Sequence, residues 1–339
     1  MTVAAGASSD AVRRLLPAVE VRGDERRVST DQANVSIAVD ERWLVKWFTR
    51  PVRRADLECV EQLARVRFAH MPAHVGALEG DGGADGRVVA VVSELVADAT
   101  DGWQWYVDDV LGWLDGHSPL GPLVSTAARM GAITAELHHA LALDQPPVAA
   151  PADDLRRTVA ERRAQALAHT TGTAGDRLRE RIDRIDAVLA QLDDVDEIQV
   201  QRVHGDLHAG QFLRAGDVRD GRLLVIDFDG DPMTDASRRL ARQPVERDLA
   251  GLLQSLDHVA RVAAKRRPGA DVSAFVRGAT QVAEAAYRDA HPVDDRLLLP
   301  LRVAQELHEF AYAGLHLPVW TYVPEAAIQS LFPATDPQE

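Results

Sequence analysis

The sequence has few cysteines, lysines and aromatic residues, and it has no long apolar run. Cys59 is the only cysteine among 339 residues, which excludes an intrachain disulfide and a thiolate metal cage. No stretch reaches the roughly 20 apolar residues that a membrane-spanning helix needs. The start of the chain, interrupted by Asp10 and Arg13, does not resemble a signal peptide. These absences predict a cytoplasmic protein with no membrane partner.

Positive charge is also scarce, since the formal net charge is -14. A protein that binds nucleic acid needs a basic face to neutralise phosphates, and no basic stripe with interleaved aromatics is present. The sequence therefore argues against a nucleic-acid partner, and it gives no indication of oligomeric state. Only two of the 38 basic residues are lysines, Lys46 and Lys265. Because Lys46 lies in an apolar segment, its compact ammonium suggests contact with a phosphate.

The length and the order of predicted elements indicate two lobes. A chain of 339 residues is too long for one small core. Residues 1–97 are predicted to form a small β-rich lobe that also holds a helix after Pro51, and residues 98–339 a mostly helical lobe. Strand-like runs lie at 35–39, 43–48, 87–96, 199–204 and 223–228. The predicted fold class is therefore α+β, with a small mixed β lobe and a larger helical lobe.

Two polar clusters accompany the last two strand-like runs. The first is His204-Gly205-Asp206-Leu207-His208, with Gln211 five residues after Asp206, and the second begins at Asp227. Phosphoryl transfer requires a carboxylate that orients the attacking hydroxyl and further oxygen ligands that hold Mg²⁺ on the phosphates. One loop can present both Asp206 and Gln211, while Asp227 ends an apolar strand. The pattern predicts a site for Mg²⁺ and ATP.

The first cluster also permits a different interpretation. His204, Asp206 and His208 alternate, so in an extended segment all three would face one side, as zinc ligands can. A metal-dependent hydrolase is therefore an alternative, although it leaves Lys46 unexplained. A kinase-like binding module without catalysis is a second alternative, which the joint presence of Lys46, Asp206 and Asp227 disfavours.

The same residues carry a resemblance to a known family. The run H-G-D-L-H, followed by Gln211 and then by I-D-F-D-G, resembles the aminoglycoside-phosphotransferase-like kinases, and the resemblance extends from about residue 31 to residue 325. Glutamine in place of the usual asparagine is similar to the maltokinase and bacterial glucosamine kinase branch. The resemblance implies a protein-kinase-like bilobal fold with ATP and Mg²⁺. It also implies that Asp206 is the catalytic base at the substrate hydroxyl, and that Gln211 and Asp227 are metal ligands.

The resemblance further implies nucleotide contacts in the first lobe. It implies that Lys46 binds phosphate and pairs with a helical glutamate, for which Glu58 is favoured over Glu61. Glu94 and Val96 match the hinge that binds adenine through its backbone. No G-x-G-x-x-G segment is present, and residues 29–32 are the candidate that replaces it.

The last predicted helix carries a polar stripe suited to a sugar. At helical spacing the stripe consists of Gln305, Glu309, Tyr312 and His316. Amide, carboxylate and phenol groups recognise sugar hydroxyls, and the carboxylate favours a sugar that bears an ammonium.

This part of the chain also resembles the glucosamine kinase signature, which adds Glu306 and Trp320 to the predicted substrate residues. The resemblance implies transfer of the ATP γ-phosphoryl group to the 6-hydroxyl of glucosamine, a small-molecule sugar partner. A maltokinase or an aminoglycoside O-phosphotransferase are alternatives with the same chemistry.

Overall fold

The computed structural model describes residues 3–30, 34–80, 86–217, 221–231, 233–239 and 241–332. The chain divides into two compact units, which we call the β-rich unit (residues 1–100 and 213–240) and the helical unit (residues 101–212 and 241–339). The α+β composition predicted from the sequence is confirmed. In the described part of the chain, no helix is both long enough and apolar enough to cross a membrane.

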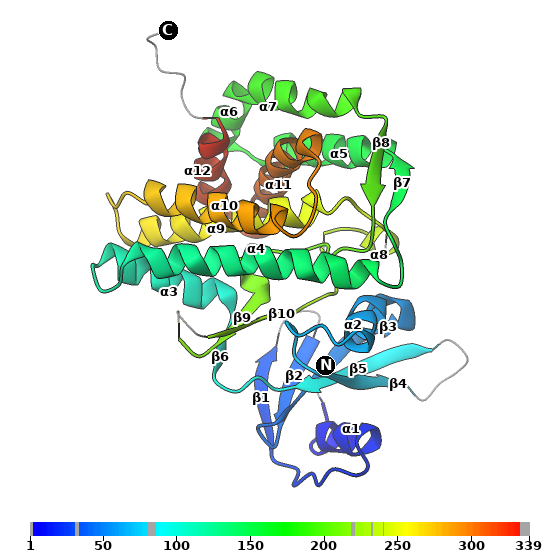
Figure 1. Ribbon diagram of the computed structural model, residues 1–339. Helices are drawn as coiled ribbons and strands as arrows, with labels where there is room; N and C mark the ends of the chain where they lie inside the picture. The colour runs from blue at the N-terminus through cyan, green and yellow to red at the C-terminus, as the bar shows by residue number, and fades with distance from the viewer. Residues whose placement is uncertain are drawn as a thin grey trace. The chain divides into compact units, whose positions relative to one another are not determined.

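The β-rich unit is built on a five-stranded antiparallel sheet with the order β1-β2-β3-β5-β4 (Figure 1). Its strands are β1 (Glu25–Thr30), β2 (Asn34–Val39), β3 (Trp43–Arg53), β4 (His74–Glu79) and β5 (Arg87–Glu94). Asp40 and Glu41 have φ values of 53° and 47°, so the hairpin between β2 and β3 closes through left-handed residues. The carboxylate of Asp40 accepts hydrogen bonds from the backbone N–H groups of Arg22 and Gly23, which stabilise this turn.

Short helices accompany this sheet: α1 (Ala7–Leu15), η1 (Arg54–Leu57) and α2 (Glu58–Arg65). Val45 packs in one core cluster with Val12 of α1, whereas Phe48 packs in another with Leu57. Successive side chains of a strand point to opposite faces. Lys46 therefore shares the face of Phe48, and its ammonium lies 5.9 Å from the centre of that ring.

Residues 213–240 belong to the β-rich unit because they pair with it. A three-stranded sheet has the order β10-β9-β6, from β6 (Ala99–Thr100), β9 (Phe212–Ala215) and β10 (Arg222–Val225). The backbone N–H of Val225 also donates to the carbonyl of His70 at 2.7 Å. The boundary predicted at residues 97–98 placed residues 213–240 in the helical lobe. Strand pairing between distant segments leaves no local signal in a sequence, so the sequence did not indicate that this segment pairs with the β-rich unit. The short helix α8 (Ala236–Arg239) follows in the same segment.

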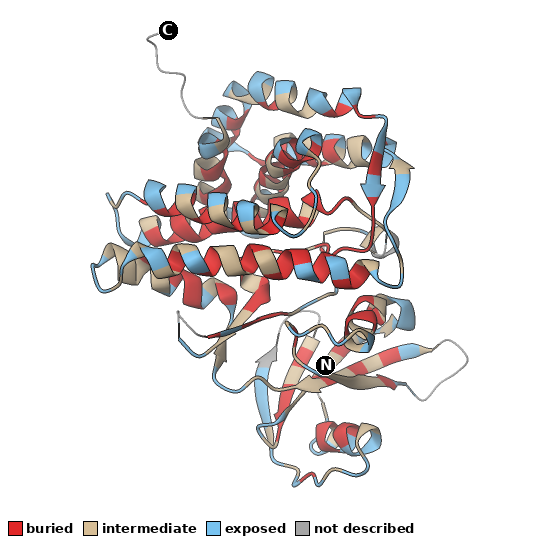
Figure 2. Ribbon diagram, viewed as in Figure 1, coloured by how far each residue is buried: buried red, intermediate tan, exposed pale blue. Residues whose placement is uncertain are grey.

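The helical unit surrounds a buried central helix, α9 (Glu246–Arg266). Its other helices are α3 (Gly102–Leu114), α4 (Leu120–Ala142), α5 (Asp153–His169), α6 (Gly172–Glu180), α7 (Ile182–Leu189), α10 (Ser273–Arg288), α11 (Asp295–His316) and α12 (Tyr322–Leu331). Short elements complete it: β7 (Val148–Pro151), η2 (Ala190–Asp194), β8 (Glu197–Val200), η3 (Ala209–Gln211) and η4 (Pro318–Trp320). Helix α9 contacts α3, α4, α10, α11 and α12, and it is buried along most of its length (Figure 2).

Burial of α9 imposes a constraint, because the helix is not apolar all round. Gln254, Ser255, Asp257 and His258 are all at most 4% exposed. Buried polar side chains must find hydrogen-bond partners or destabilise the fold. The partners of Gln254, Ser255 and His258 lie in the segments that carry the predicted functional residues, whereas Asp257 pairs with Arg261 of α9 itself.

Candidate active site

Lys46, Asp227 and Asp229 form an ion-pair cluster within the β-rich unit. The ammonium of Lys46 lies 2.8 Å from Asp227 Oδ1 and 2.7 Å from Asp229 Oδ2. Asp227 has a φ of 64°, a left-handed conformation that is strained for a residue with a Cβ. The chain therefore turns sharply just beyond β10, and both carboxylates reach the same ammonium.

The electrostatics of this cluster favour a cation. Burial alone would lower the pKa of Lys46, but the carboxylates of Asp229 and Asp227 outweigh it and raise that pKa. One ammonium opposes two carboxylates, whose side chains are 46% and 41% exposed for Asp227 and Asp229. The excess negative charge and the accessible, hard oxygen donors suit Mg²⁺. The donor set thus fits the metal that the sequence implies.

The ion pairs that Lys46 forms in this structure differ from the predicted pairing with a glutamate of α2. Among the described residues, the ion-pair partners of Lys46 are the two aspartates alone, while Glu61 pairs with Arg54 at 2.6 Å. Glu58 is the first residue of α2 and is half-buried. A pair between Lys46 and Glu58 stays a prediction for the nucleotide-bound protein.

The other predicted nucleotide contacts lie at the ends of strands. Glu94 ends β5, and its backbone N–H donates to the carbonyl of Ala73 at 2.8 Å. Val96 lies in the connection from β5 to β6 and is half-buried. Their contact with adenine stays a prediction. The candidate phosphate loop at 29–32 falls partly outside the described residues, since only its first two positions, at the end of β1, are described.

In the helical unit, α9 fixes the loop that carries Asp206. The carboxylate of Asp248 accepts hydrogen bonds from the backbone N–H of His204 at 2.7 Å and of Gly205 at 2.9 Å. The hydroxyl of Ser255 accepts one from the N–H of Ala209 at 2.8 Å. The loop is therefore anchored on both sides of Asp206, which is itself half-buried. A carboxylate held in this way is pre-organised for catalysis.

Asp248 is itself held by a buried network. Its Oδ2 lies 3.0 Å from Nε2 of His138, whose Nδ1 lies 2.7 Å from the hydroxyl of Tyr287. Burial alone would raise the pKa of Asp248, but hydrogen bonding and charge from His138 and His204, with the N–H of Gly205, lower it. Asp248 is thus a carboxylate anion inside the protein, and it braces the Asp206 loop.

Two glycines let neighbouring helices approach this loop. A Cβ on Gly102, at the start of α3, would lie 1.7 Å from the carbonyl oxygen of Ala209. A Cβ on Gly251 of α9 would lie 2.4 Å from the carbonyl oxygen of Leu207. Neither position tolerates a side chain without displacement of the backbone. Close backbone contact, together with the hydrogen bonds from α9, holds the loop in place.

The predicted metal ligand Gln211 lies at the end of η3. Its side-chain nitrogen lies 3.3 Å from Nε2 of His208, and the residue is 8% exposed. The other ring nitrogen of His208 accepts a hydrogen bond from the N–H of Gly210 at 3.0 Å. The amide of Gln211 thus lies beside the ring of His208, and the role of Gln211 as a metal ligand stays a prediction.

The alternative zinc site does not form. Nδ1 of His204 accepts a hydrogen bond from the N–H of Asp206 at 3.3 Å, and His208 is engaged by the backbone of its own loop. Within the described ranges, no three histidine, cysteine, aspartate or glutamate side chains are grouped closely enough to hold a metal ion. Because no tight three-ligand cluster is present, the structural basis for a zinc hydrolase is lost.

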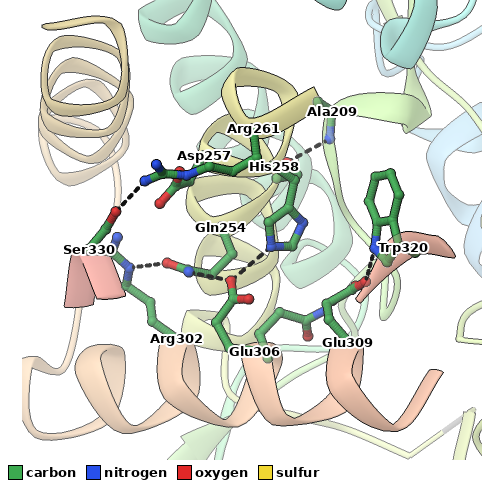
Figure 3. A network of polar contacts seen from close by, with 12 residues as sticks. Ala209, Gln254, Asp257, His258, Arg261, Arg302, Glu306, Glu309, Trp320 and Ser330 are labelled. Carbon is green, nitrogen blue, oxygen red and sulfur yellow. Dashed lines mark hydrogen bonds and ion pairs between the residues drawn. The ribbon is translucent and has the colours of Figure 1, made fainter. Parts of the chain in front are cut away.

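The predicted polar stripe on α11 is present. The amide nitrogen of Gln305 lies 3.3 Å from Glu309 Oε1, and the indole N–H of Trp320 donates to Glu309 Oε2 at 3.2 Å (Figure 3). Further along, the rings of Tyr312 and His316 are 5.4 Å apart. Gln305, Glu309, Tyr312 and Trp320 are half-buried, so ligand can reach them. Their contact with a substrate stays a prediction.

Glu306 faces a different way. It is 0% exposed, and its Oε1 accepts hydrogen bonds from Gln254 at 2.5 Å and from His258 at 2.8 Å (Figure 3). In this structure its carboxylate meets α9, and a substrate does not reach it without rearrangement. Direct contact between Glu306 and substrate, expected from the sequence, has no support in this geometry.

Sequence reasoning missed four contributors to the site. Asp229 lies two residues after Asp227 and shares Lys46, and the D-x-D spacing is the signal that could have found it. Ser255 and His258 gave no local signal, because their partners are more than 40 residues away. Asp248 reads as a helix-capping residue in sequence, and its contact with the Asp206 loop needs the fold.

Comparison with known proteins points to one group of enzymes. The chain matches the phosphotransferase enzyme family over residues 84–254. It is 39% identical over 326 residues to a glucosamine kinase of Streptacidiphilus jiangxiensis, covering 91% of this chain and 74% of that protein. It is 36% identical over 323 residues to a glucosamine kinase of Mycolicibacterium smegmatis, covering 91% and 79% respectively.

Solved structures agree with the sequence relatives. A glucosamine kinase in complex with glucosamine, ADP and inorganic phosphate is similar with a TM-score of 0.84 at 35% identity, over 98% of this chain and 84% of that chain. A spectinomycin phosphotransferase in complex with ADP and spectinomycin has a TM-score of 0.55 at 12% identity, over 98% and 93% respectively. The second similarity shows that the fold is shared.

Proposed function

The chain belongs to the phosphotransferase enzyme family, and we propose that it is a glucosamine kinase that transfers the γ-phosphoryl group of ATP to the 6-hydroxyl of glucosamine. The observation that carries the proposal is the half-buried stripe of Gln305 and Glu309, which lies in the same unit as the anchored Asp206 loop. Similarity to two glucosamine kinases over 91% of the chain supports it.

Asp206 performs the proton chemistry in this proposal. Its carboxylate orients the 6-hydroxyl and accepts the hydroxyl proton while a bond forms between that oxygen and the γ-phosphorus. The bond from the γ-phosphorus to the β-phosphate oxygen breaks at the same centre, and ADP leaves with the bonding electrons. Anchoring by Asp248 and Ser255 supports this role, because a general base must be held in place.

Lys46 binds phosphate oxygens of ATP, and Asp227 and Gln211 hold Mg²⁺, which neutralises charge on the phosphates when bound. The accessible carboxylate of Asp227 beside the ammonium of Lys46 supports this assignment. Glu94 and Val96 contact adenine through the backbone, and Glu58 pairs with Lys46 when the nucleotide is bound. These assignments follow the positions of the residues in the family pattern.

The acceptor binds along α11 in this proposal. The carboxylate of Glu309 pairs with the ammonium of glucosamine, Gln305 and Tyr312 hydrogen-bond its hydroxyls, and the indole of Trp320 covers the ring. Trp320 already holds one oxygen of Glu309, so the carboxylate is aimed before substrate arrives. A neutral sugar such as maltose has no ammonium to pair with that carboxylate, which favours glucosamine.

An acceptor screen tests the proposal. ADP release is measured with glucosamine, glucose, maltose and kanamycin, and the position of the phosphate in the product is determined by NMR. We expect glucosamine to give the highest kcat/KM and a 6-phosphate product. A higher kcat/KM for maltose or kanamycin would overturn the choice of acceptor and leave the phosphotransferase chemistry intact.

Asp206→Asn tests the assigned base. We expect kcat to fall by about 10²- to 10⁴-fold, because the amide cannot accept the hydroxyl proton. Asp193→Asn, which changes an exposed aspartate in η2 of the same unit, is the matched control and leaves kcat unchanged. An unchanged kcat in Asp206→Asn would remove Asp206 from the mechanism.

A further inference from the structure

Helix α9 contacts both the Asp206 loop and the helix that carries the polar stripe. Ser255 accepts the hydrogen bond from Ala209 on one side of the helix. Gln254 and His258 reach Glu306 of α11 on another (Figure 3). A single rigid element therefore spans from the catalytic loop to the acceptor helix. The proposed reaction uses none of Gln254, His258 or Glu306 directly.

The contact with α11 is a buried, hydrogen-bonded ion pair. His258 is 4% exposed and Glu306 is 0% exposed, and Nε2 of His258 lies 2.8 Å from Glu306 Oε1. Gln254 donates to the same oxygen, and its own oxygen accepts a hydrogen bond from Arg302 at 2.7 Å. Burying two charges costs about as much as their attraction returns, so such a pair is weak evidence for a role in stability. The geometry of the pair is better evidence for a role in fixing the register of α11 against α9.

The pair lies next to the acceptor-facing side chains. The ring of His258 lies edge-on to Trp320, with centroids 6.4 Å apart and planes at 86°. Trp320 in turn donates to Glu309, which follows Glu306 by three residues on α11. The pair of His258 and Glu306 therefore helps to fix both side chains. It fixes Glu309 through helix α11, and it fixes Trp320 through the contact between the rings of His258 and Trp320.

We propose that His258 and Glu306 are positioning residues for the acceptor. They fix α11 in register against α9, and so hold Glu309 and Trp320 at a set place relative to the Asp206 loop. This role rests on the proposed function, which assigns Glu309 and Trp320 to the acceptor. It also gives Glu306 an indirect part in substrate binding that agrees with its complete burial.

The charges around His258 agree with an ion pair. Burial alone would lower its pKa, but the carboxylates of Glu306, Glu309 and Asp257 raise the pKa of His258 to about 9. Asp257 is itself paired with Arg261 at 2.6 Å, and Arg302 lies on the far side of Gln254. Glu306 therefore meets an imidazolium at neutral pH.

Glu306→Gln is a nearly isosteric test. Oε2 of Glu306 is buried with no hydrogen-bond partner among the described residues. The amide nitrogen of the new glutamine can therefore occupy this position without facing another hydrogen-bond donor. The remaining oxygen still accepts from Gln254 and His258, and only the charge is lost. His258→Gln is the complementary variant, because it removes the charge and the ring from the other side.

We expect the KM for glucosamine to rise about 10-fold or more in both variants, as for other residues that orient a binding group. The KM for ATP stays within about twofold, because the pair does not position the nucleotide lysine. Histidine NMR gives an independent readout: His258 stays protonated to about pH 9 in the wild type and titrates at lower pH in Glu306→Gln. Leu123→Ala, at a 1% exposed position of α4, is the control that lowers stability and leaves the KM for glucosamine unchanged.

Other outcomes would overturn the positioning role. An unchanged KM for glucosamine in both folded variants would do so, as would an equal rise in the KM for ATP. Loss of glucosamine binding in Glu306→Gln but not in His258→Gln would make Glu306 a direct ligand instead. Failure of the wild type to phosphorylate glucosamine would overturn the proposed function, whereas unaltered variants of an active enzyme overturn the positioning role alone.

Discussion

At the scale of single residues, the use of lysine at position 46 is explained by the two carboxylates that its ammonium contacts. Its ammonium lies within 2.8 Å of two carboxylates from one turn after β10. A planar guanidinium would need a wider, fork-shaped arrangement of acceptors. Apart from Lys265, the other basic residues of the chain are arginines. Position 46 therefore requires a compact charge that can move from a carboxylate to a phosphate.

Lys46→Met and Lys46→Arg test this requirement. We expect Lys46→Met to lower kcat/KM for ATP by about 10²- to 10³-fold, because a preorganised charge at the phosphates is removed. Lys46→Arg should recover only a small part of that loss. The measurement is steady-state kinetics with ATP varied at saturating glucosamine.

The chain supplies its own control, since Lys265 is its only other lysine. Lys265 is exposed on α9, where its ammonium lies 5.1 Å from the ring centre of Tyr322. Lys265→Met should leave kcat/KM for ATP unchanged. Full recovery by Lys46→Arg would show that any positive charge suffices and would contradict the geometric argument.

At the scale of elements, α9 connects the parts of the helical unit. Asp248 near its start anchors the Asp206 loop, and His258, ten residues further along the helix, contacts α11. Both contacts are buried, and in both a carboxylate lies beside a histidine. The placement of Asp206 therefore depends on an element that begins about forty residues later in the chain.

Asp248→Asn tests the brace on the Asp206 loop. We expect the free energy of unfolding to fall by about 3–5 kcal/mol, because His138 and two backbone N–H groups lose a buried anion. We also expect kcat to fall more than KM, since the base is displaced. Urea unfolding and steady-state kinetics are the measurements.

Glu284→Gln is the control for that variant. It removes a partly exposed ion pair with Arg288 on α10, which is worth at most about 1 kcal/mol. A kcat that is unchanged in folded Asp248→Asn would show that the loop keeps its shape without the brace.

The sequence predicted the elements whose signals are local. Strand-like runs predicted β2 and β3, and helical spacing predicted the helix with the polar stripe, α11. The helix expected directly after Pro51 begins later, because β3 continues to Arg53 and η1 follows it. Strands β1, β4 and β9 were missed. Strand β9 pairs with β6, more than 100 residues earlier in the chain, whereas β1 and β4 pair with strands that are close in the sequence.

The same limit applies within the candidate site. Asp206, Asp227 and the stripe on α11 could be predicted, because motif spacing and helical periodicity are local properties. Glu306 shows how a side chain can be misplaced: it lies on the face of α11 that also carries Val303 and Phe310, both at most 1% exposed. A helical projection assigns it to the interior, whereas resemblance to a substrate motif favoured the surface.

At the scale of the whole molecule, a buried ion pair makes stability sensitive to pH. His258 pairs with Glu306, and both side chains are at most 5% exposed. Histidine is the side chain whose ordinary pKa lies closest to neutrality, so its burial in an ion pair links protonation to folding. The many surface pairs between arginine and acidic residues contribute little by comparison.

The pair of His258 with Glu306 gives the sign and range of this dependence. The pKa of His258 is raised from 6.5 to about 9 in the folded chain. Below pH 6.5 the imidazole is protonated in both folded and unfolded chains, and the stabilisation is fully present. Between pH 6.5 and 9 the folded chain binds the proton more tightly, so stability falls as pH rises, by on the order of 3 kcal/mol in total. In Glu306→Gln the largest influence that raises the pKa of His258 is lost and only the carboxylates of Glu309 and Asp257 still oppose burial, so this part of the decline becomes smaller. Urea unfolding of the wild type, Glu306→Gln and Leu123→Ala at pH 6.5 and 9 measures the difference. Leu123→Ala should keep the wild-type decline at a lower absolute stability, and an equal decline in Glu306→Gln would show that His258 is not the group that titrates.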